Sequence, residues 1–137
     1  MRRRPRGQAI VEMGIVLVLL VTLIMGIVEF GRAFMIANMI THATRDAARA
    51  AAIVPAGSRN TSGIITNVAA IEGLVKTQLT GTVDTSVLTA KLTQTTTSGI
   101  PTVTMTVTGT VPYVFNLPGV GKTFSVNRAV TFRDEGR

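Results

Sequence analysis

The sequence contains no cysteine and no tryptophan, and only 4% of its 137 residues are aromatic. Without cysteine the chain has no disulfide, no thiolate metal site and no cysteine nucleophile. Any domain outside the cytoplasm must therefore be held together by packing and hydrogen bonds alone. The scarcity of aromatic side chains also removes the stacking surfaces on which single-stranded nucleic acids are bound.

Charge is also scarce, and its distribution is uneven. Charged residues make up 15% of the chain, and 14 basic against 7 acidic residues give a formal net charge of +7. Four arginines without an acid among them lie in the first seven positions: Arg2, Arg3, Arg4 and Arg6. The pI of about 11.4 therefore reflects mainly a short terminal segment. The sequence predicts no nucleic-acid partner.

The residues that usually carry catalysis or bind metals are few and dispersed. His42 is the only histidine, and we expect it on the surface, among threonine, alanine and arginine. The acids form no dyad or metal-ligand set in sequence. They are Glu12, Glu29, Asp46, Glu72, Asp84, Asp134 and Glu135. We therefore expect no enzyme activity, catalytic residue, metal, cofactor or small-molecule substrate.

The segment Gly119–Thr123, GVGKT, resembles the end of a phosphate-binding loop. The first glycine of such a loop would stand at position 116, where the chain has Asn116. The loop must also open a helix whose N–H groups point at phosphate, whereas Phe124–Phe132 is predicted to be a strand. The sequence therefore predicts a glycine-rich turn here and no nucleotide site.

A long apolar run begins close to the N-terminus. Met13–Val28 contains no charged residue, and the twenty residues counted from Ala9 contain one carboxylate, Glu12. Twenty helical residues span about 30 Å, the thickness of the hydrocarbon core of a bilayer. The run is too long for a secretory signal peptide and no small-residue cleavage site closes it. It predicts one membrane span, with the arginines inside and the C-terminus outside.

The start of this span resembles the processing site of type IV pilin-like proteins. The basic leader ends at Gly7, and Glu12 is the fifth residue after it. The resemblance implies that a membrane-embedded prepilin peptidase cuts between Gly7 and Gln8. The new amino group of one subunit would then pair with Glu12 of another in low dielectric. The alternative is a carboxylate that snorkels to the headgroups without a partner.

Two further segments extend the resemblance to the TadE-like family, minor pilins or pseudopilins of the tight-adherence (Flp) pilus system. One is the box Glu29, Phe30, Gly31 and Arg32, and the other is the alanine-rich stretch 43–52. The chain departs from the family pattern at Leu17–Leu19, where a proline is frequent, and at Ala48, where a glycine is common. By spacing alone, Glu29 and Arg32 are expected to form a solvated i,i+3 pair with a snorkelling arginine.

After the span the helix is expected to continue to about Val54, where Pro55 stops it. Its outer half is amphipathic, with an apolar face made by Ile36, Ile40, Ala43, Ala47 and Ala51.

The remaining sequence predicts a second helix and a small sheet. Apolar residues from Ile64 to Leu79 have helical spacing, with Thr61 or Ser62 as the N-cap. Strands are predicted at 87–92, 102–108 and 124–132, where the middle segment alternates threonine with apolar residues. Gly99–Pro101 suits the hairpin connection between the first two strands. Along the last strand, Arg128 interrupts an apolar face made by Phe124, Val126, Val130 and Phe132.

Together these features predict a pilin-like α+β fold. Residues 1–7 form a cytoplasmic basic leader, 8–32 a transmembrane helix, 33–54 its extracytoplasmic continuation, and 55–137 a small α+β domain. The resemblance implies a structural subunit of the bacterial cytoplasmic membrane or of an extracellular pilus. Its implied partners are lipid, the prepilin peptidase, other pilin or pseudopilin subunits and pilus assembly platform proteins. The alternative is an unprocessed single-span protein that presents an adhesive or scaffold domain.

Overall fold

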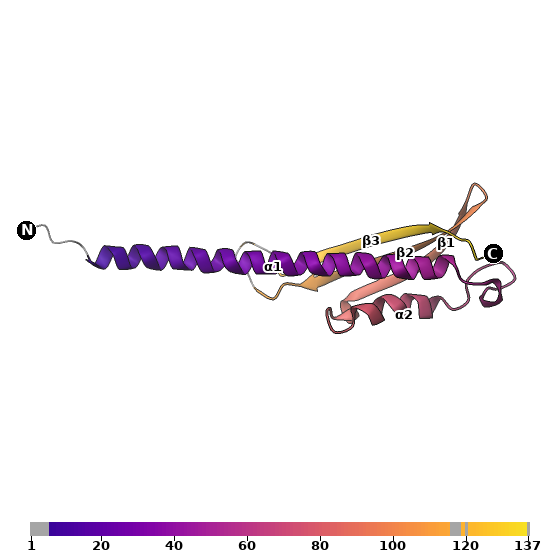
Figure 1. The fold of residues 1–137 in the computed structure, drawn as a ribbon, viewed down its shortest axis with the longest axis horizontal. Coiled ribbons are helices and arrows are strands. Elements are labelled where there is room, and N and C mark those ends of the chain that lie inside the picture. Colours follow the sequence, from indigo (N-terminus) through magenta and orange to yellow (C-terminus); the bar gives the residue numbers. More distant parts are fainter. Residues whose placement is uncertain (1–5, 116–118, 120, 137) are drawn as a thin grey trace, which may run out of the picture.

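The computed structural model describes residues 6–115, 119 and 121–136. Its dominant element is α1 (Arg6–Ala52), an unbroken helix of 47 residues, about 70 Å long at 1.5 Å per residue. No proline lies within α1, so nothing interrupts its hydrogen bonds. The helix ends two residues earlier than predicted, because a residue before proline, here Val54, disfavours helical backbone. Figure 1 shows the N-terminal half standing free and the C-terminal half lying along a sheet.

The sheet has three antiparallel strands in the order β1 (Leu88–Thr97), β2 (Ile100–Pro112) and β3 (Thr123–Arg133). Together with α1 and the second helix described next, it confirms the predicted α+β fold. Ser98 and Gly99 form the β1–β2 turn, with φ angles of 52° and 77°. Positive φ at both central residues is required by the type I′ turn, whose twist matches that of the strands. The prediction that the connection extended to Pro101 is wrong, because this two-residue turn leaves Ile100 and Pro101 paired within β2.

The second helix, α2 (Val68–Leu79), is shorter than predicted. The side chain of Asn60 accepts hydrogen bonds from the amides of Ser62, at 3.0 Å, and Ile64, at 2.8 Å. Ile65 then pairs with Arg59 in an isolated β-bridge. These local bonds hold the segment in a turn, so the prediction of an N-cap at Thr61 or Ser62 is wrong. Asn67 occupies that position instead.

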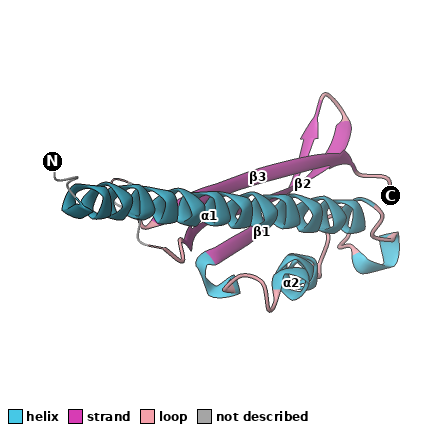
Figure 2. Cartoon of the chain, turned by 60° about the vertical axis from the view of Figure 1, so that its left-hand side comes forward, coloured by secondary structure: helices cyan, strands magenta, loops and turns pink. Residues whose placement is uncertain are grey.

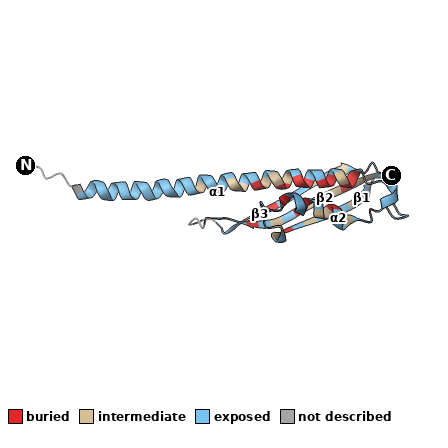
Figure 3. Ribbon diagram, turned by 60° about the horizontal axis from the view of Figure 1, so that its bottom comes forward, coloured by how far each residue is buried: buried red, intermediate tan, exposed pale blue. Residues whose placement is uncertain are grey.

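The core lies between the sheet and the two helices, which cover the same face (Figure 2). Every residue of the predicted apolar face of α1 is buried, which confirms it. Alternate residues of β2 meet this face: Val103, Met105, Val107 and Val111. Figure 3 shows buried residues confined to the C-terminal half of α1 and to the domain beneath it. On the predicted apolar face of β3, Val126 is buried, Phe124, Val130 and Phe132 are partly buried against the core, and Arg128, which interrupts this face, is exposed.

The turn before β1 fits closely against the middle strand. The carboxylate of Asp84 accepts a hydrogen bond from the amide of Ser86 at 2.9 Å. The hydroxyl and the amide of Ser86 together hold the pKa of Asp84 below its ordinary value. On β2, a Cβ at Gly109 would collide with the carbonyl oxygen of Val87 and with Leu88. Glycine at this position therefore allows the turn to approach the sheet.

Candidate functional site: the apolar helix and its junction with the outer domain

The N-terminal half of α1 is apolar and uncovered. Every residue from 7 to 25 is exposed. An 18-residue stretch of the helix has a mean hydropathy of 2.7, and none of it is buried. Such a continuous apolar surface is unfavourable in water, and its length matches a bilayer. This half of α1 therefore has the properties of a single membrane span.

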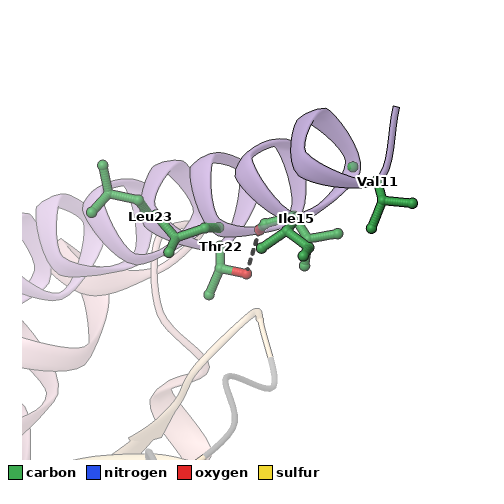
Figure 4. Close-up of a pocket in the computed structure, with 7 residues that line it drawn as sticks. Val11, Ile15, Thr22 and Leu23 are labelled. Carbon is green, nitrogen blue, oxygen red and sulfur yellow. Dashed lines mark hydrogen bonds between the residues drawn. The ribbon is translucent and has the colours of Figure 1, made fainter. Parts of the chain in front are cut away.

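A shallow groove runs along one face of this free half. Figure 4 shows its lining side chains projecting from α1, with Val11, Ile15, Thr22 and Leu23 labelled. All of its lining residues belong to α1, so it is a helix surface rather than an enclosed binding cavity. The hydroxyl of Thr22 donates to the carbonyl oxygen of Val18 at 2.9 Å, which satisfies it within an apolar environment.

Gly7, Gln8 and Glu12, the residues of the predicted processing site, lie in the first turns of α1. Apart from its chain neighbours and the backbone of its own helix, no atom of the described residues approaches within 4 Å of the place where a Cβ of Gly7 would stand. The side-chain amide of Gln8 donates to Glu12 Oε1 at 3.1 Å, one turn along the helix. Arg2, Arg3 and Arg4 of the predicted leader lie outside the described residues. The pairing of Glu12 with a neighbouring subunit stays a prediction.

Glu29, at the end of the apolar run, is buried, with a relative exposure of 3%. Arg32 Nη2 lies 2.7 Å from Glu29 Oε1, since positions three apart share a helix face. The amides of Val114 and Phe115, in the β2–β3 loop, donate to Glu29 Oε2 at 3.1 and 3.2 Å. Arg32 Nη2 also donates to the carbonyl oxygen of Pro112 at 2.6 Å. We call these contacts the junction.

The junction shows that the expectation of a solvated pair between Glu29 and Arg32 is wrong. The carboxylate is covered by the end of the β2–β3 hairpin, whose amides have left the sheet and are free to donate to it. The box therefore has two faces, because Phe30 points away and is 75% exposed while Glu29 faces the loop. The partners of Glu29 lie 85 and 86 positions further along the chain, so spacing on the helix had no means of revealing them.

A second buried ion pair, at the distal end of the domain, was missed by sequence reasoning. Arg59 binds Asp134 through two hydrogen bonds of 2.7 and 2.8 Å, and the two side chains are 3% and 1% exposed. Arg59 also donates to the carbonyl oxygens of Val54 and Gly63, each at 3.0 Å. This pair ties the C-terminal segment to the loop that follows α1.

No group of three or more acidic or histidine side chains that could hold a metal occurs in the part of the chain that the structure describes. His42 is exposed, as the sequence predicted. The GVGKT segment leads into β3 at Thr123, which confirms that it opens a strand rather than a helix. Asn116 and Val120, used in judging that motif, lie outside the described residues.

In the comparison with protein families, the model of the TadE-like protein family matches residues 7–49. The chain carries a TadE-like segment. The match includes the free half of α1, the box at 29–32 and most of the alanine-rich stretch, so the predicted resemblance is confirmed. Comparison with curated proteins and with solved structures gives no significant match. The TadE-like family is structural and associated with the Tad pilus, and the apolar helix fits a single-pass membrane protein of such a system.

Proposed function

We propose that the chain is a minor pilin or pseudopilin, a structural subunit needed to assemble a tight-adherence pilus. The observation that carries this proposal is the division of α1. Its TadE-like N-terminal half is apolar and uncovered, while its C-terminal half forms part of the core of the outer domain. One continuous helix therefore joins a segment suited to lipid or to other helices with a folded domain.

In this role, each part of the chain has a defined location relative to the membrane. The leader 1–7 lies in the cytoplasm and the helix 8–32 crosses the membrane. Residues 33–54 continue it outside, where they carry the domain 55–137. Assembly would involve lipid, a prepilin peptidase, other pilin or pseudopilin subunits and assembly platform proteins. The alternative is an unprocessed single-span protein that presents an adhesive or scaffold domain.

The position of Gly7 in the fold supports processing after it. The helix begins at Arg6, so the bond between Gly7 and Gln8 lies in the first turn. A peptidase that binds extended backbone must unwind only this turn, which is the least stable part of a helix and contains glycine, a poor helix former. The remaining turns of the span can stay helical during cleavage.

Co-expression with a prepilin peptidase is expected to remove the first seven residues and expose Gln8 as the new N-terminus. Intact-mass measurement and N-terminal sequencing test this directly. Gly7→Leu should block the cut, because the side chain obstructs close binding of the backbone at that position. Gly14→Leu is the matched control, since Gly14 is also helical and its missing Cβ would meet nothing beyond its chain neighbours and its own helix backbone within 4 Å. A wild-type protein that retains Arg6 in peptidase-positive cells would contradict the pilin proposal.

A reporter enzyme that works only outside the cytoplasm is expected to be active when fused after Arg137. A reporter that works only in the cytoplasm is expected to be inactive at the same position. Lysines inserted after Arg32 should lower the activity of the first reporter, because they reduce the charge difference that orients the span. The same lysines inserted at the exposed Gly81, which lies 49 positions after Arg32 in the sequence, serve as the control. A C-terminus in the cytoplasm would contradict both the pilin proposal and its alternative.

A further inference from the structure

The start of the β2–β3 loop, at Val114 and Phe115, lies beside the outer end of the apolar span. Glu29 follows directly on Val28, the last residue of the uncharged run. Because the amides of Val114 and Phe115 bind Glu29, this part of the loop is held at the level where the span ends. In Figure 1 the β2–β3 end of the sheet is the part of the domain that reaches furthest toward the free half of α1.

The described side chains at this level are of the kinds found at a membrane surface. Val114, whose amide binds the carboxylate of Glu29, is 65% exposed, and Phe30, which follows Glu29 on α1, is 75% exposed. Lys122 is also exposed, and its carbonyl oxygen accepts a hydrogen bond from the amide of Tyr113 at 2.9 Å. Val114 and Phe30 are thus exposed apolar side chains, and the aromatic Tyr113, which is bonded to Lys122, lies next to Val114 in the chain. This combination matches the boundary between acyl chains and headgroups.

We propose that the junction places Val114 and Phe115, at the start of the β2–β3 loop, in the outer leaflet of the bilayer. Val114 and Phe30 enter the headgroup–acyl boundary, and the ammonium group of Lys122 contacts phospholipid phosphates. The occupant of this surface is a phospholipid bilayer, because the surface is continuous with the free half of α1. This inference rests on the membrane insertion given under the proposed function, and not on pilus assembly.

Glu29 acts in this arrangement as a positioning residue. Its two carboxylate oxygens accept hydrogen bonds from Arg32 Nε and Nη2 and from the amides of Val114 and Phe115. The negative charge is thereby neutralised inside the protein, so the carboxylate can lie at the edge of the hydrocarbon without drawing water to it. The same bonds fix the depth of Val114 relative to the span.

Because the chain contains no tryptophan, one introduced tryptophan reports its own surroundings. The full chain carrying Val114→Trp is reconstituted in phosphatidylcholine vesicles with and without phosphatidylglycerol, some with brominated acyl chains. Its emission is expected to shift to the blue and to be quenched by bromine about as strongly as that of Phe30→Trp. Ile100→Trp, which lies 48% exposed at the opposite end of β2, should be neither shifted nor quenched.

Two further variants test the assigned roles. Glu29→Gln in the Val114→Trp chain removes the charge that holds Arg32 and should lower the bromine quenching at position 114. Quenching of Leu19→Trp, within the span, should be the same with and without Glu29→Gln. Phosphatidylglycerol is expected to increase the blue shift of Val114→Trp, because its negative charge attracts Lys122. Lys122→Gln should reduce this increase.

The outcomes separate this inference from the proposal on which it rests. If Leu19→Trp is quenched while Val114→Trp is not, the chain inserts but its loop stays in water, and the inference is wrong. If neither is quenched, membrane insertion itself fails. If Val114→Trp shifts only in assembled pili and is insensitive to bromine, the loop contacts a neighbouring subunit, which also overturns the inference.

Discussion

Asp134→Ala is expected to destabilise the outer domain by about 3 to 5 kcal/mol, the usual cost of removing one partner of a buried ion pair. The guanidinium of Arg59, 3% exposed, would stay buried without its counter-charge. The amide of Gly136 would also lose the carboxylate oxygen to which it donates at 3.4 Å. Urea unfolding of the full chain in detergent micelles, followed by far-UV circular dichroism, measures the change in the midpoint.

The adjacent acid provides a matched control. Glu135 is exposed, and Glu135→Ala should change the free energy of unfolding by less than about 0.5 kcal/mol. The paired change Arg59→Met with Asp134→Leu should cost less than Asp134→Ala alone, because it removes both charges and fills the space with apolar groups. Equal midpoints for Asp134→Ala and Glu135→Ala would show that the ion pair does not hold the end of the domain.

The sequence predicted the fold correctly where the spacing of apolar residues within a single helix or strand shows which of its faces is buried. In α1, apolar residues such as Ile36 and Ile40 recur with the period of a helix, and in β2, Val103 and Met105 alternate with threonine. Both patterns follow from a single face turned to a core, and both sets of residues are buried. The start of α2 was misjudged because the side chain of Asn60 stabilises a turn, a local competitor that apolar spacing does not reveal.

The contacts that attach the elements to one another were not predictable in the same way. Glu29 is bound by backbone amides, which every residue except proline possesses, so no residue type in the β2–β3 loop marks its partner. Arg59 and Asp134 are 75 positions apart, and each is an ordinary charged residue in its own segment. Only the folded arrangement brings the loop after α1 together with the segment after β3.

The role that the family resemblance implies for Glu12 is a contact between subunits rather than a contact within one chain. Within one chain its carboxylate is exposed and accepts a hydrogen bond from Gln8 at 3.1 Å. If the chain is cut after Gly7, as proposed, Gln8 would become the N-terminal residue and would carry a positive charge on its backbone nitrogen. Glu12 of the next subunit would then balance that charge in low dielectric.

Glu12→Ala is therefore expected to leave membrane insertion unharmed or improved, since it removes a charge that is costly in lipid. Assembly should nevertheless fall strongly, because the new amino group would be buried without its counter-charge, a loss of about 3 to 5 kcal/mol. Immunoblots of membranes and of sheared pili, with N-terminal sequencing to confirm cleavage, must be made on the same samples. Each sample then gives its own ratio of assembled to inserted protein.

Glu12→Gln separates the charge from the shape of the side chain. The amide keeps nearly the same volume and still accepts a hydrogen bond, but it carries no negative charge. If the ion pair drives assembly, Glu12→Gln should fail as Glu12→Ala does, whereas Glu12→Asp should retain part of the wild-type ratio. Asp46→Ala, which removes an exposed acid from the outer half of α1, should assemble normally. If Glu12→Ala inserts, is cleaved and assembles like the wild type, Glu12 has no pairing role, because nothing then distinguishes it from a carboxylate that snorkels to the headgroups.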